Sequence, residues 1–132
     1  MVKKPLVRWL FIGVSAPGIQ PDSNGRTNGN SSAYGMFSSG AVRAAGQLII
    51  DGDTKLPASS IIQADLLKQR EDMDKVFCSG DEVVVVLDCT AHTLMLQSPT
   101  VQHVIPIQQQ HHKHEWVLDV DFWPGYFQVS LG

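Results

Sequence analysis

The sequence has few basic residues. Its 132 residues include only 10 Lys and Arg against 13 Asp and Glu, which gives a net charge of −3. This balance excludes a strong electrostatic attraction to the phosphates of nucleic acid or to an anionic membrane surface. We therefore expect neither nucleic acid nor a membrane as a partner.

Cysteine is also scarce, and long apolar runs are absent. The two cysteines, Cys78 and Cys89, lie in or beside expected strands, which favours buried thiols in a reducing compartment over a disulfide. No stretch approaches the roughly 18 apolar residues of a membrane span. Near the amino terminus, Arg8 interrupts an apolar run that would otherwise resemble a signal peptide. These features predict a protein of the cytoplasm.

The length and the 43% apolar content are typical of one globular domain, which we place at residues 1–132. Short apolar or alternating segments are separated by Gly, Pro, Asn and Ser. The expected strands cover residues 6–14, 33–42, 47–50, 75–87, 94–97 and 101–107, followed by a closing hairpin. This pattern predicts an all-β fold, an antiparallel β-sandwich.

One short helix is expected beside the strands. Ser60 and Gln63 form a capping box, and apolar residues such as Leu66 and Met73 follow at helical spacing. The sequence therefore predicts a helix over residues 61–74.

Residues 17–32 read as a long exposed loop, rich in Pro, Gly, Asn and Ser. Loops of this length in a compact domain are usually functional or disordered. The Asn-Gly steps lack the Gly-Lys-Ser/Thr ending of a phosphate-binding loop, so we expect no nucleotide site.

The closing hairpin alternates with period two. Trp116, Leu118, Val120 and Phe122 fall on one face, and Val117, Asp119, Asp121 and Trp123 on the other. Pro124-Gly125 then breaks the strand, and residues 126–131 return. The tryptophan at the tip, Trp123, is either a lid on a nearby core cluster or an anchor for binding.

Two clusters could carry chemistry. His111, His112 and His114 with Glu115 have a ligand-like density, but one short loop rarely supplies a rigid zinc frame. A solvated loop explains the histidines more simply, and we expect no metal and no cofactor.

The second cluster is a pair of acids. Asp119 and Asp121 share a strand face about 7 Å apart, a separation that overlaps that of glycosidase carboxylates. With Trp123 they could form a carbohydrate or small-molecule binder, or a hydrolase. An outward, wet strand face explains the pair more simply, and the sequence predicts no enzyme.

The order of these features resembles the SPRY domain. Phe77-Cys-Ser-Gly80-Asp81 opens the run that ends in Leu87-Asp88, and Thr93-Leu94 follows, as in that family's core signature. The segments Leu10 to Val14 and Ser32 to Gly35 look like its Val-Gly strand and its Ser-Trp-Gly-Tyr segment, with Tyr34 where a Trp is usual. The resemblance implies a concanavalin-like sandwich and a non-catalytic module for protein–protein interaction, recognising a peptide segment or protein surface through edge loops.

The resemblance also implies where a protein partner would bind. The aromatic-Gly pair of the last hairpin falls on Trp123 and Gly125, with Pro124 inserted between them, and a further contact position falls near Arg43. The loop over residues 17–32, which carries Arg26, completes the expected site. SPRY domains normally have several strands before the Val-Gly strand, so either the sandwich is trimmed or another chain, such as a second copy, covers the exposed sheet edge.

Overall fold

A computed structural model describes residues 9–21, 23, 26–50, 58–63, 65, 76–77, 80–113 and 115–123, with the backbone alone at residues 9, 58, 122 and 123. Eight strands and two 3₁₀ turns occur there: β1 (Trp9–Ser15), β2 (Tyr34–Phe37), β3 (Val42–Ala44), β4 (Gln47–Ile50), η1 (Ala58–Ser60), β5 (Val84–Asp88), β6 (Thr93–Gln97), β7 (Gln102–Pro106), η2 (Gln109–His111) and β8 (Val117–Trp123). In the described part of the chain, no helix is long and apolar enough to cross a membrane.

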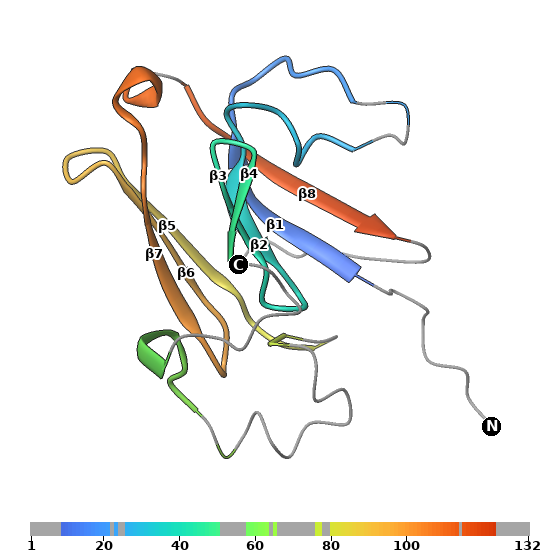
Figure 1. The fold of residues 1–132 in the computed structure, drawn as a ribbon, viewed down its shortest axis with the longest axis vertical. Coiled ribbons are helices and arrows are strands. Elements are labelled where there is room, and N and C mark those ends of the chain that lie inside the picture. The colour runs from blue at the N-terminus through green and yellow to red at the C-terminus, as the bar shows by residue number, and fades with distance from the viewer. Residues whose placement is uncertain are drawn as a thin grey trace.

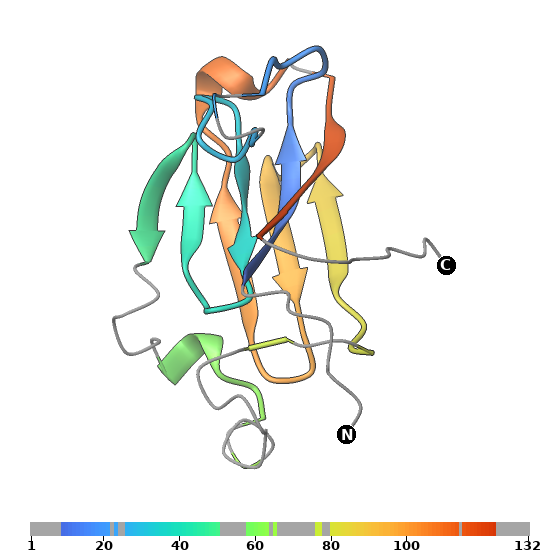
Figure 2. The same ribbon diagram turned by 90° about the vertical axis from the view of Figure 1, so that its right-hand side faces the viewer.

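The strands form two antiparallel sheets that face each other (Figures 1 and 2). One sheet has the order β4-β3-β2-β1-β8, and the other has the order β5-β6-β7. The predicted all-β sandwich is therefore confirmed.

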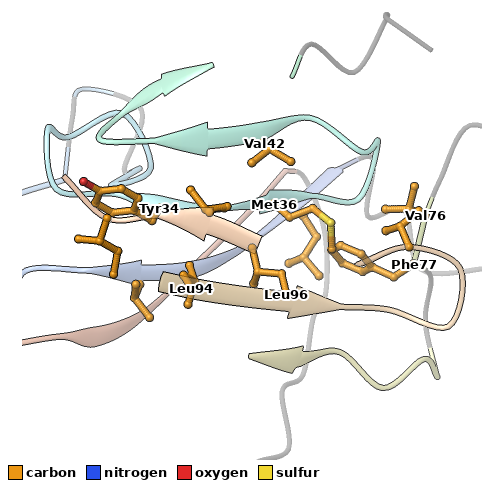
Figure 3. Close-up of a cluster of buried hydrophobic side chains, with 12 residues drawn as sticks. Tyr34, Met36, Val42, Val76, Phe77, Leu94 and Leu96 are labelled. Carbon is orange, nitrogen blue, oxygen red and sulfur yellow. The ribbon is translucent and has the colours of Figure 1, made fainter. Parts of the chain in front are cut away.

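The core lies between the two sheets. Alternate residues of β1 and β2, among them Leu10, Tyr34 and Met36, face Leu94 and Leu96 of β6, and all of them are buried. Figure 3 shows Tyr34 and Met36 in one cluster with Leu94 and Leu96, and Val76 and Phe77 lie at one end of it. Period-two alternation thus places one apolar face of each sheet inside, and its removal from water stabilises the sandwich.

Two glycines lie opposite each other on the outer face of the five-stranded sheet. Gly13 of β1 lies opposite Gly35 of β2 in the strand register. A Cβ atom on Gly13 would lie 2.0 Å from the carbonyl oxygen of Tyr34, and one on Gly35 would lie 2.6 Å from the Phe11 ring. The Phe11 ring therefore lies across Gly35, and it is fully buried although it belongs to the outer face.

Three expectations need correction here. Residues 61–63 are not helical: Ile61 forms a β-bridge with Val101, and the Ile62 N–H donates to the Thr100 carbonyl. Asp65 is helical, and the rest of residues 64–74 lie outside the described residues. Cys89 is exposed in the β5–β6 turn, so a buried thiol is wrong for it, whereas Cys78 lies outside the described residues.

The third correction concerns Ser60, which ends η1 instead of capping a helix. Its Oγ lies 3.1 Å from Nδ1 of His103, a buried residue of β7. The Nε2 atom of His103 is also buried and has no hydrogen-bond partner among the described residues. Burial lowers the pKa of His103 below the ordinary value of 6.5, so the imidazole is neutral in the fold.

This imidazole makes stability depend on pH. Because the pKa of His103 is lowered by folding, the unfolded chain binds more protons below about pH 6.5, and stability present above that pH is lost as the pH falls. We expect the His103→Gln variant to lose less stability than the wild type between about pH 7.5 and about pH 5, measured by urea unfolding. Equal losses in the two proteins would contradict this assignment.

The glycine contact gives a second test. Gly13→Ala should lower the free energy of unfolding by about 3 kcal/mol, because the new methyl group overlaps backbone that cannot move away. Gly29→Ala is the matched control, since a Cβ there meets nothing within 4 Å. Urea unfolding of both variants measures the difference, and a tolerated Gly13→Ala would show that β1 and β2 are farther apart than described.

Candidate functional site

The segment that connects β1 to β2 is described at residues 16–21, 23 and 26–33, and its residues 27 and 28 are hydrogen-bonded to the five-stranded sheet. The Ala16 N–H donates to the Ser32 hydroxyl at 3.0 Å, which closes the segment at its base. Within it, the Asn30 side-chain oxygen accepts from the N–H of Ser32 at 2.8 Å, and its amide nitrogen donates to the Thr27 carbonyl. Asn28 and Ser32 are buried. The expectation of an exposed loop is therefore wrong for these two residues, although none of the described residues of the segment belongs to a strand.

The contacts with Asp121 of β8 hold this segment to the sheet. Its Oδ2 accepts from the N–H of Thr27 at 3.1 Å, from the N–H of Asn28 at 2.8 Å and from the side-chain amide of Asn28 at 2.7 Å. Asp121 is only 7% exposed. Backbone N–H groups donate to one carboxylate oxygen here, as they do at the N-cap of a helix. Hydrogen bonds to an ionised group are stronger than those between neutral groups.

Asp119 lies two residues earlier on the same strand and has fewer partners. Its Oδ1 accepts from the Thr27 hydroxyl at 2.5 Å, while the same hydroxyl lies 3.3 Å from Oδ1 of Asp121. Its Oδ2 is buried, and the Ser15 hydroxyl also interacts with this carboxylate. The Thr27 hydroxyl thus bridges two carboxylates but has a single proton to donate.

Burial raises the pKa of Asp119 above its ordinary value. The Thr27 hydroxyl opposes this rise, the negative charge of Asp121 adds to it, and the Ser15 hydroxyl also opposes it. Desolvation penalises the charged form, and too few donors are present to compensate. The sequence-based expectation of an outward, wet face for the two acids is therefore wrong, because the connecting segment covers them.

Thr27 helps to line two recesses, and the acid pair lines the first of them. The first has a volume of about 290 Å³ and lies over the start of β8; it is lined by Ser15, Ala16, Gly18, Ile19, Thr27, Val117, Leu118, Asp119, Val120 and Asp121. The second has a volume of about 260 Å³ and lies within the segment; it is lined by Gln20, Arg26, Thr27, Gly29 and Asn30. Figures 1 and 2 show the segment at one end of the sandwich, above β8.

The residues expected to bind a protein are distributed over this sheet. Arg26 lines the second recess. Arg43 of β3 donates to the Gly46 carbonyl at 2.7 Å, and its guanidinium lies 5.5 Å from the centre of the Phe37 ring. Both arginines are partly buried.

Trp123 lies at the other end of the sheet. It ends β8, opposite Trp9 of β1, whereas Asp119 lies in one transverse row with Gly13, Gly35 and Arg43. Four residues along the strand span about 13 Å, and three strand spacings span about 14 Å. The structure thus keeps Trp123 and Arg43 well apart, and Pro124 and Gly125 lie outside the described residues.

The histidines have structural contacts instead of forming a solvated loop. Nδ1 of His111 lies 2.6 Å from the buried Tyr34 hydroxyl, which also accepts from the Gln108 N–H. The ring of His112 stacks on that of His92 at 3.6 Å. The expectation of a solvated loop is therefore wrong for His111, which is buried, and His114 lies outside the described residues. In the part of the chain that the structure describes, no three His, Cys, Asp or Glu side chains are placed to hold a metal ion.

Thr27 and Asn28 were missed by the reasoning from sequence. Both belong to a polar run of Gly, Thr and Asn that offers no periodicity, and their carboxylate partners lie more than 90 residues away. The available signal in the sequence was the pair Asp119 and Asp121, which lie at alternate positions of an otherwise apolar strand. The chain matches no protein-family model, and no curated protein or solved structure matches it either.

The two acids differ in their hydrogen bonds, so they should differ in their effect on stability. Asp121→Ala leaves the N–H groups of Thr27 and Asn28 without their acceptor and should cost about 3 kcal/mol. Asp119→Ala should cost about 1 kcal/mol or less, because the Thr27 hydroxyl can turn to Asp121 and a poorly solvated charge is removed. Urea unfolding, together with amide hydrogen exchange at residues 27 and 28, measures both effects. Equal losses would show that the acids anchor the segment jointly.

Proposed function

We propose that this chain is a non-catalytic module that binds a peptide segment or protein surface through the loop end of its five-stranded sheet, in the manner of the SPRY domains that it resembles. The observation that carries the proposal is that Thr27 and Asn28 of the β1–β2 segment are hydrogen-bonded to Asp121, beside two recesses that Thr27 helps to line.

The way in which the segment is held supports binding. A loop that must be ordered when a partner arrives reduces the affinity, whereas a loop already fixed by buried hydrogen bonds avoids this entropic loss. Asp121 accepts three hydrogen bonds from Thr27 and Asn28, two of them buried. Recognition loops carried on a rigid sheet are a common arrangement in binding domains.

The exposed side chains near the recess also suit a protein partner. Val117 and Leu118 of β8 are 44% and 43% exposed, and both line the first recess. A recess lined by both polar and apolar residues resembles the mixed character of protein interfaces. From this recess, β8 runs to Trp123, so an extended segment lying along the strand would reach the aromatic anchor expected from the sequence.

A carbohydrate or small-molecule binder or hydrolase that uses Asp119, Asp121 and Trp123 is less well supported. Glycosidases need two carboxyl groups that flank the substrate. Here Oδ2 of Asp121 is engaged by three N–H donors, and the Thr27 hydroxyl lies between the acids. These contacts favour a role for Asp121 in holding the segment over a role in acid–base chemistry.

Site-specific photo-crosslinking in a lysate of the native cell tests the proposed function. A photoreactive phenylalanine analogue replaces Gln20, which is exposed and lines the second recess, or Val104, which is 56% exposed on the three-stranded sheet. We expect a protein partner to be captured from position 20 and not from position 104. In the background of Trp123→Ala, capture should fall about tenfold, as at an interface hot spot.

Two outcomes would contradict this function. Capture from position 104 alone would place the interface on the other sheet. A folded protein that captures no partner from either position would remove the interaction function. A folded Trp123→Ala variant with undiminished capture would show that Trp123 is a lid on the core and not an anchor.

A further inference from the structure

β5 is a terminal strand of the three-stranded sheet, whose order is β5-β6-β7, and Figure 2 shows it in yellow at the right-hand side of the sandwich. One edge of β5 pairs with β6, from Val84 opposite Gln97 to Asp88 opposite Thr93. None of the described strands pairs with its other edge. Alternate N–H and C=O groups of a terminal strand point away from the sheet, so this outer edge offers the donors and acceptors that an added strand needs.

The other terminal strands have features that hinder the addition of a strand. The pairing of β4 with β3 contains a shift in register. β7 ends at Pro106, which has no N–H to donate, and Ile61 forms a β-bridge with Val101, the residue before β7. Along β8, the sequence predicts the return of residues 126–131. β5 contains no proline and no lysine, and its register with β6 is continuous. It therefore lacks the features that protect sheet edges.

The outer face of β5 has an apolar centre between two acids. Val84 and Val86 are 37% and 45% exposed. Glu82, two residues before β5, and Asp88, its last residue, are exposed as well. Exposed and half-buried residues alternate over the whole of residues 82–88, as expected of side chains that point to the two faces of a strand. The four exposed side chains thus form one row along the edge.

This row is negatively charged at both ends. The N–H groups of Ala91 and Thr90 donate to the Asp88 carboxylate at 2.8 Å and 2.9 Å, and they lower the pKa of Asp88 below its ordinary value. No lysine or arginine occurs from Val76 to His112, so the three-stranded sheet has no such cation of its own. A partner with positive charge at both ends would complement the edge.

Charge disfavours a second copy of this chain as the occupant. In an antiparallel pair of two β5 strands with Val84 opposite Val86, Glu82 would lie opposite Asp88 at both ends. Like charges directly opposite each other destabilise a strand pair, whereas opposite charges stabilise it. A segment with basic residues at those two positions therefore matches the edge better than β5 itself does.

We infer that the outer edge of β5 binds an extended segment of another protein as a fourth, antiparallel strand of this sheet. The segment has β-branched or aliphatic side chains opposite Val84 and Val86, and a lysine or arginine opposite Glu82 and opposite Asp88. Its backbone supplies affinity through the added ladder, and its side chains supply specificity. This surface belongs to the other sheet from the recesses, so the inference does not depend on the proposed function.

Titration with a synthetic peptide tests this inference. Acetyl-Lys-Val-Thr-Val-Thr-Val-Lys-amide has its two lysines at the same separation along the chain as Glu82 and Asp88, and it is added to ¹⁵N-labelled protein. We expect saturable amide shifts over residues 82–88, with a Kd of roughly 0.1–1 mM. The same peptide with glutamine in place of both lysines should bind about fivefold more weakly, and about 1 M salt should remove that difference.

Methylation of the peptide nitrogens distinguishes strand addition from a contact between side chains alone. The N–H groups that face β5 belong to alternate residues of an added strand. One peptide is methylated at the nitrogens of its two threonines, and another at those of its three valines. One of these two peptides should bind at least tenfold more weakly than the parent peptide, while the other should keep its affinity.

Two matched variants locate the charge contact. Glu82→Lys should remove the preference for the lysine peptide over the glutamine peptide, because one attractive pair becomes a repulsive one. Glu115→Lys makes the same change of charge at another exposed residue, outside the three-stranded sheet, and should keep the preference of the wild type.

The absence of shifts over residues 82–88 would overturn the inference, as would equal affinities for the lysine and glutamine peptides at low salt. Equal losses from both methylated peptides would also overturn it. Slow exchange of every N–H of residues 84–88 in the free protein would show that the edge is already occupied. Sedimentation would then assign that occupant to a second copy, if the protein is a dimer, or to another part of this chain, and either result refutes the inference.

The crosslinking test of the proposed function remains separate from these experiments. A fourth strand beside β5 would lie three strand spacings from Val104 of β7, about 14 Å, which is beyond the reach of a photoreactive side chain at that position. Peptide binding without any capture from position 20 would refute the proposed function alone. Capture from position 20 without peptide binding would refute the added strand alone.

Discussion

The hydrogen bonds from Thr27 and Asn28 to Asp121 are the contacts on which the loop end of the molecule depends. They join two parts of the chain 93 or 94 residues apart and fix the β1–β2 segment on the outer face of the sheet. Thr27, which these bonds hold, helps to line both recesses. The glycine pair Gly13 and Gly35 lies in the same transverse row of the sheet as Asp119.

The two acids of β8 are compensated to different degrees. Asp121 is surrounded by donors, so its charge is compensated inside the fold. Asp119 interacts only with the hydroxyls of Thr27 and Ser15, and burial raises its pKa above the ordinary value. That contrast underlies our assignment of the anchoring of the β1–β2 segment to Asp121.

The buried histidines also connect separate parts of the fold. His111 pairs with Tyr34 and His103 pairs with Ser60, so each links a loop or turn to the core through a polar contact. A dense group of histidines invites a metal interpretation, yet imidazoles also serve as amphipathic fillers whose polar atoms reach a hydroxyl. The stacking of His92 on His112 ties the β5–β6 turn to η2 in a similar way.

The sequence by itself determined the strands and the faces that their residues share. Alternation in β8 placed Asp119 and Asp121 on one face, and the turn residues between apolar segments predicted the sandwich, because both depend on local backbone geometry. Only the tertiary structure decided which face is covered. Period two tells which side chains point the same way, but not whether a polar loop from the other end of the chain will settle on them. That depends on donors such as the N–H groups of Thr27 and Asn28, which a sequence shows only as two more polar residues in a loop.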